Sequence, residues 1–92
     1  MADVDGALRS LRDTLHSLLA RVSEDFAIAD RVTRAHLKVN AILMNSPNTA
    51  SDVKLSKLRK LTEALAQLGL SNKPELDRQL DALEALLADL SQ

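Results

Sequence analysis

The feature that most constrains the fold is a pair of leucine repeats separated by one short turn. In residues 58–68 and again in residues 76–90, leucines recur mainly at spacings of three and four. This spacing places them on one face of an α-helix. Gly69 and Pro74 interrupt the pattern between the repeats. The sequence therefore predicts a helical hairpin whose two leucine faces are buried.

Cap residues refine the limits of the predicted helices, 52–68 and 74–91. Gly69 is placed to end the first in a left-handed, Schellman-type stop. Asn72, with Glu75 three residues later, offers a cap for the second. Ser51 and Asn48 are the candidate caps for the helix that begins at residue 52. These caps predict a short, well-defined turn within the hairpin.

The N-terminal half carries a leucine and valine seam of the coiled-coil type from Val4 to Val22, with spacings of four and three. A second apolar stripe runs from Ile28 to Ile42 in a different phase. Either the helix breaks near Val22, with Ser23 capping a new one, or a single helix of about 40 residues continues and its buried face rotates. The phase shift favours the break, which gives helices over residues 4–22 and 24–45.

Four helical segments of similar length with short connections predict an all-α, antiparallel up-down four-helix bundle, a single domain over residues 1–92. The alternative is one long N-terminal helix of about 40 residues followed by the hairpin. Its long helix would be half-covered in a monomer, so this alternative predicts a dimer.

The long-helix alternative resembles the small helical chorismate mutases in architecture. That resemblance implies a small all-α enzyme whose cationic side chains converge on a dicarboxylate. Ala29, Val32 and Val39 occupy positions that would face the interior, and they are apolar. The sequence offers no catalytic set, so we favour a non-catalytic protein and keep this enzyme as the alternative.

Composition excludes several other classes of function. The net charge of −1 and the single aromatic residue disfavour nucleic-acid binding. Without cysteine there is no disulfide or thiolate chemistry. The N-terminus is acidic, and the longest apolar run, residues 41–44, is far shorter than a membrane span. We expect an intracellular, cytoplasmic protein without a membrane partner.

His16 and His36 are the only two histidines. Neither has a histidine or glutamate three or four residues later, the spacing that metal sites in helical bundles use. The sequence therefore predicts structural histidines and no metal, cofactor or catalytic residue.

The predicted function is that of a helical protein–protein interaction module, adaptor or small subunit that buries apolar helix faces. Its partner would be a second copy, in a homodimer, or another helical protein. Residues 24–45 are apolar over a wide arc, which indicates burial on more than one side. The partner-interface candidates there are Phe26, Ile28, Val32, Val39, Ile42, Leu43 and Met44. A basic cluster that could contact an acidic partner consists of Lys54, Lys57, Arg59 and Lys60. Residues 74–91 are acidic, and we expect them to pair with this basic cluster across the hairpin.

Overall fold

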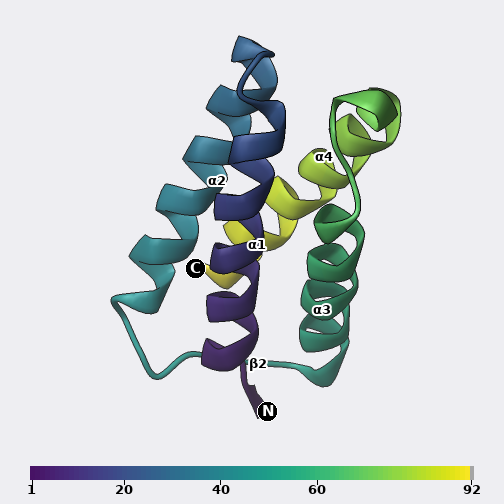
Figure 1. The fold of residues 1–92 in the computed structure, drawn as a ribbon. Helices are drawn as coiled ribbons and strands as arrows, with labels where there is room; N and C mark the ends of the chain where they lie inside the picture. Colours follow the sequence, from purple (N-terminus) through teal and green to yellow (C-terminus); the bar gives the residue numbers. More distant parts are fainter. Residues whose placement is uncertain (92) are drawn as a thin grey trace.

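The computed structural model describes residues 1–91, and four α-helices form in that range (Figure 1). The helices are α1 (Asp5–Val22), α2 (Phe26–Leu43), α3 (Asp52–Ala66) and α4 (Lys73–Leu90). A 3₁₀ turn, η1 (Leu70–Asn72), precedes α4, and two short strands, β1 (Ala2–Asp3) and β2 (Thr49–Ala50), pair antiparallel. The predicted helical bundle and the break after Val22 are confirmed, so the single long helix is excluded.

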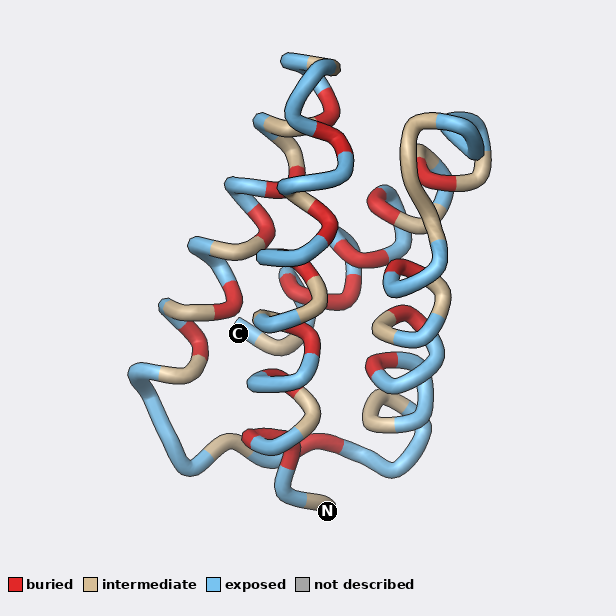
Figure 2. The backbone as a smooth tube through the Cα atoms, in the orientation of Figure 1, coloured by how far each residue is buried: buried red, intermediate tan, exposed pale blue. Residues whose placement is uncertain are grey.

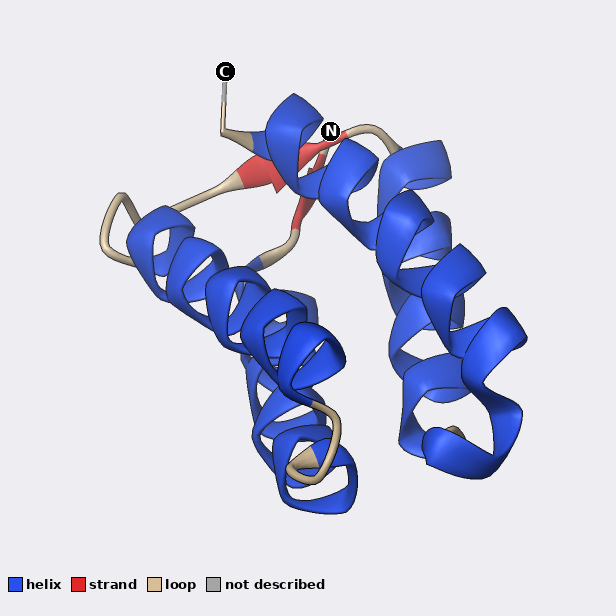
Figure 3. Cartoon of the chain, turned by 90° about the horizontal axis from the view of Figure 1, so that it is seen from above, coloured by secondary structure: helices blue, strands red, loops and turns tan. Residues whose placement is uncertain are grey.

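Successive helices alternate in direction, and each helix of the bundle packs against two others. α1 packs against α2 and α3, and α4 packs against the same two helices from the other side. Figures 1 and 3 show that α4 is inclined to the other helices. The N-terminal pair, α1 and α2, therefore forms a close hairpin, and the C-terminal pair is more open.

The core is aliphatic and lies along the facing stripes of all four helices. Figure 2 shows the buried positions turned toward the inside of the bundle. The predicted seam of α1 is fully buried, as are Leu58 and Leu65 of α3 and the leucines that begin α4. Each such leucine contributes about 1.5–3 kcal/mol of hydrophobic stabilisation relative to an exposed one. The leucine repeats thus account for the bundle.

The start of α1 is fixed to the connection between α2 and α3. The Val4 amide donates to the Asn48 carbonyl at 3.0 Å. The buried Asp5 carboxylate accepts from Asn48 Nδ2 at 2.8 Å and from the Ser46 hydroxyl. Hydrogen bonds from Ser46 and then Asn48 lower the pKa of Asp5, so the carboxylate stays ionised. The connection is thereby ordered although it carries many turn-forming residues.

Of the three N-terminal caps predicted for α2, α3 and α4, two are wrong and one is confirmed. Ser51 caps α3, since its hydroxyl accepts from the Lys54 amide at 3.3 Å. α2 is capped by Asp25, which accepts from the Ile28 amide at 3.2 Å, and Ser23 lies outside the helix. Asn72 makes no side-chain cap.

Gly69 has extended backbone, with φ of −162°, so the predicted left-handed stop does not form. The carbonyl groups at the end of α3 are satisfied by a side chain from α1 instead. Arg21 donates from Nη2 to the Leu65 carbonyl at 3.0 Å and from Nε to the Leu68 carbonyl at 3.1 Å. A cation at the negative end of a helix is favourable in addition to these hydrogen bonds. The end of α3 is therefore set by hydrogen bonds from Arg21 of α1 and not by a left-handed glycine at position 69.

Candidate functional site

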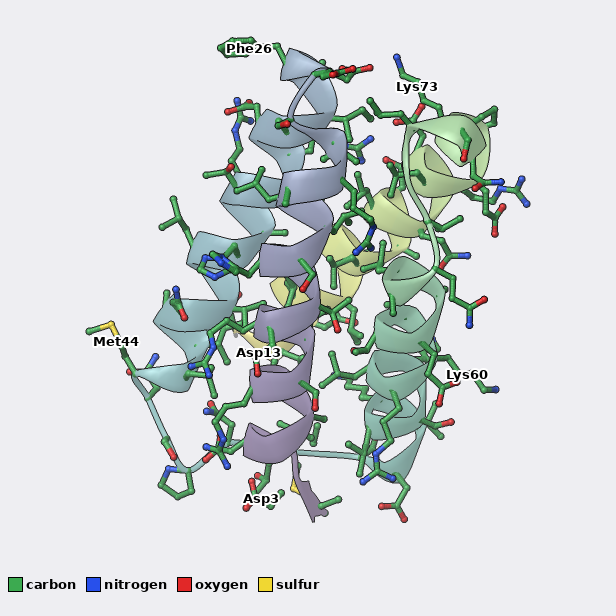
Figure 4. The ribbon with its side chains drawn as sticks, in the orientation of Figure 1. Asp3, Asp13, Phe26, Met44, Lys60 and Lys73 are labelled. Carbon is green, nitrogen blue, oxygen red and sulfur yellow. The ribbon has the colours of Figure 1, made fainter. Side chains whose placement is uncertain are left out.

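The predicted partner interface on α2 falls into two groups. Ile28, Val32, Val39 and Ile42 are buried in the core, and Leu43 is half-buried against it. Phe26 and Met44 are 89% and 86% exposed, and Figure 4 shows them projecting away from the bundle at the two ends of α2. Leu37, between them on the outward face, is also exposed. Three separated apolar side chains form no continuous groove, and an interface through α2 stays a prediction.

The acidic face of α4 pairs with α2, and not with the basic cluster of α3 as the sequence predicted. Arg31 of α2 donates to Asp77 at 3.2 Å, to Asp81 at 2.6 Å and to Glu84 at 3.2 Å. Glu84 and then Asp81 raise the pKa of the Arg31 guanidinium. The reason for the correction is geometric: these three acids lie on the side of α4 that faces α2, where one guanidinium reaches all of them.

Among residues 1–91, the side chains of the basic cluster of α3 have no ion-pair partner. Lys57, Arg59 and Lys60 are exposed, and Lys54 is half-buried. Lys57 and Lys60 line the space between α3 and α4. Arg59 does not line that space; it lines one depression beside the start of α1 and shares another, on α3 itself, with Lys60. Two of the four predicted acidic-partner contacts are therefore brought to one surface feature.

That feature is an open groove of about 600 Å³ between α3 and α4, which we call the α3–α4 groove. Its apolar lining is aliphatic and includes three alanines, and its edges carry both signs of charge. The lining residues are Lys57, Lys60, Leu61, Ala64, Gln79, Ala82, Ala85, Leu86 and Asp89. The volume is in the range of pockets that bind small molecules, but the groove is open to solvent and does not enclose a ligand.

Small side chains explain why the groove exists. Ala82 and Ala85 lie beside the leucine stripe of α4, and Ala64 faces them from α3. Alanine fills little space, so the two helices leave a hollow over Leu61 and Leu86. Arg31 holds α4 on the side of α2, which is consistent with the inclination of α4 in Figure 1.

The sequence contained a signal for this groove that its leucine pattern concealed. Ala82 and Ala85 are three residues apart and share a face with Leu86 and Asp89. In the sequence they are ordinary helix formers, and nothing there indicates which residues face them. They become informative only once the structure places Ala64 and the two lysines opposite them.

Comparison with known proteins adds no assignment: no protein-family model, curated protein or solved structure matches the chain. Over residues 1–91, no helix is long and apolar enough to cross a membrane.

Proposed function

We propose that this chain is a non-catalytic helical interaction module that binds an amphipathic helix of a partner protein in the α3–α4 groove. The observation that carries the proposal is the hollow over Leu61 and Leu86, which exposes apolar lining between two helices. Amphipathic helices bind such grooves by inserting apolar side chains at helical spacing. The three alanines allow the backbone of a third helix to approach closely.

The length of the groove suits a short helical contact. On α4 the lining extends from Gln79 to Asp89, which is about 15 Å at 1.5 Å per residue. A partner helix would therefore make contact over about three turns. Contacts of this size belong to the weak, transient class of interactions. An adaptor or an assembly subunit could use such a contact.

Charge defines the partner further. Lys57 and Lys60 form the α3 edge of the groove and have no ion-pair partner within the described chain. A partner helix with glutamate or aspartate along that edge would complement them, and complementary charge favours both encounter and register. We therefore propose an acidic-edged amphipathic helix from another protein as the occupant of the groove. A second copy of this chain is the competing occupant.

The cysteine-free composition supports a cytoplasmic location.

The alternative function, a chorismate-mutase-like enzyme, has lost its architectural basis. That resemblance required a continuous N-terminal helix, and the chain breaks between α1 and α2. Asp5 is the one buried charged residue among those described. Among residues 1–91, no set of converging cations favours the enzyme over the interaction module.

A displayed library of amphipathic helices tests the proposal without knowledge of the natural partner. Helices selected against the wild-type chain should carry acids along one edge of an apolar face. Their binding should fall at least tenfold when Ala85→Leu fills the groove, and several-fold when Lys60→Glu reverses its edge. Arg59→Glu makes the same charge change on the adjacent residue outside the groove, so it should change binding much less.

Three measurements decide the outcome. Thermal unfolding must first show that Ala85→Leu remains folded, which we expect because Ala85 is exposed. If the selected helices bind Ala85→Leu as tightly as the wild type, the binding site lies elsewhere and the proposal is overturned. A dimer in sedimentation that Ala85→Leu converts to monomer would replace the external helix with a second copy of the chain.

A further inference from the structure

The two histidines face each other across the contact between α1 and α2. The ring centroids of His16 and His36 are 6.2 Å apart, and the ring planes are inclined by 45°. His16 is exposed and His36 is half-buried, so the space around the rings is open to solvent. The sequence placed each histidine alone on its own helix, and the antiparallel pairing of the two helices brings them together.

This separation is somewhat longer than the one that chelation requires. With metal–nitrogen bonds of about 2.0–2.1 Å, each ring centroid lies about 3.2 Å from the ion, so two imidazoles at bond angles of about 90–110° have centroids about 4.5–5.3 Å apart. The observed 6.2 Å exceeds that range by about 1 Å. Small rotations about the side-chain bonds of the exposed His16 would complete the approach without any movement of the backbone.

Asn40 is placed to orient one of the two rings. Its Nδ2 lies 3.4 Å from Nδ1 of His36, one turn earlier on α2. Nε2 of His36 is thereby left for another partner. If the amide is turned, its oxygen can accept a proton from Nδ1, which is the interaction that usually orients a metal-bound histidine.

We propose that His16 and His36 form a two-imidazole site for a transition-metal ion of the class that prefers imidazole, namely Zn²⁺, Ni²⁺ or Cu²⁺. Both rings bind through neutral nitrogens, and Asn40 is a positioning residue for His36. Within residues 1–91 no third histidine, cysteine or carboxylate joins them in a metal-binding group. Water completes the coordination, and Cu²⁺ binds most tightly of the three.

The bound ion would link α1 to α2, since each helix supplies one ligand. An ion that binds the folded chain in preference to the unfolded chain raises its stability by mass action. Saturating Zn²⁺ should therefore increase the midpoint of thermal unfolding by several degrees. This effect is separate from the α3–α4 groove, which lies on other helices.

Calorimetric titration of the whole chain with ZnCl₂, NiCl₂ and CuCl₂ tests the proposal. We expect one ion per chain, and at least a tenfold loss of affinity in both His16→Ala and His36→Ala, because each leaves a single imidazole. The matched control combines His16→Gln with Ser17→His, which keeps two histidines but turns one away from the pair. It should bind as weakly as the single variants.

The variants at Asn40 distinguish positioning from simple surface binding. Asn40→Asp can still accept the Nδ1 proton and should bind at least as tightly as the wild type, whereas Asn40→Leu should bind several-fold more weakly. The histidine ring signals in NMR spectra should shift together on titration. A control chain that binds as tightly as the wild type, or single variants without loss, would show independent binding to exposed histidines and overturn the proposal.

Discussion

Replacing Arg31 with methionine should separate the contribution of charge from that of packing at the contact between α2 and α4. The guanidinium makes three ion pairs, at 3.2 Å to Asp77, 2.6 Å to Asp81 and 3.2 Å to Glu84. Methionine keeps a long apolar stem and loses all three pairs. It also leaves three carboxylates at positions i, i+4 and i+7 of α4, where like charges repel.

The loss of stability expected for Arg31→Met follows from the solvent exposure of the paired side chains. The side chain of Arg31 is 26% exposed, whereas its partner acids are 45–73% exposed. Pairs of this kind contribute about 0.2–1 kcal/mol each. One guanidinium serves all three pairs and is immobilised only once, so the variant should lose about 2 kcal/mol of unfolding free energy. For a domain of this size, that loss lowers the unfolding midpoint by roughly 8–10 °C.

Arg34→Met is the matched control in a thermal-unfolding assay. Arg34 lies on the same helix but is 76% exposed, and its one ion pair within residues 1–91 is with Asp30. Its loss should cost about 0.3–0.5 kcal/mol, or about 2 °C. Raising the salt from 0.1 M to 1 M shortens the Debye length from about 10 Å to about 3 Å, so the difference between the two variants should narrow. If the variants unfold within about 0.3 kcal/mol of each other at low salt, the three pairs of Arg31 stabilise the fold no more than the single exposed pair of Arg34, and the reasoning fails.

Two further predictions concern charged side chains that join one helix to another. Arg21→Ala removes the hydrogen bonds to the end of α3 and should lower the free energy of unfolding by about 1 kcal/mol. Arg21→Lys should recover part of that loss. Faster hydrogen exchange of the backbone amides after residue 66 would show that the end of α3 frays. Lys73 lies 2.6 Å from Asp25 and lowers the pKa of that carboxyl below 3.8. The contribution of Asp25 is thus present above that pH and lost as the pH falls through its lower folded value, so Asp25→Asn should be destabilising at pH 7 but approach the wild type in acid unfolding.

The fold could be predicted from the sequence because its dominant signal is local. Spacings of three and four place leucines on one helix face whatever the rest of the chain does. The change of phase between Val22 and Ile28 similarly required a break or a rotation of the buried face. Ser23 was the wrong cap because Asp25, two residues later, also offers a side-chain oxygen. Local patterns locate a helix boundary to within a few residues but do not choose between adjacent cap residues.

The long-range polar contacts could not be predicted, because each depends on which helices are neighbours. Arg21 makes Gly69 unnecessary as a left-handed stop only because α1 and α3 end side by side. Arg31 reaches α4 only because α2 and α4 are neighbours, and its three acids are then not paired with the basic cluster of α3. A sum of charges for each helix predicted attraction between α3 and α4, but direction on the helix surface decides which charges meet.

The same argument explains why both proposed sites were missed and how they differ in specificity. The α3–α4 groove is defined by small side chains, Ala64, Ala82 and Ala85, so its occupant is selected by shape and by the edge charge of Lys57 and Lys60. The pairing of His16 and His36 is defined by two donor atoms, so its occupant is selected by chemistry. A helix that fills the groove need not disturb the histidines on the other helix pair. Zinc should therefore leave the binding of a selected helix unchanged, and a change would show that α1 and α2 communicate with the groove through the shared core.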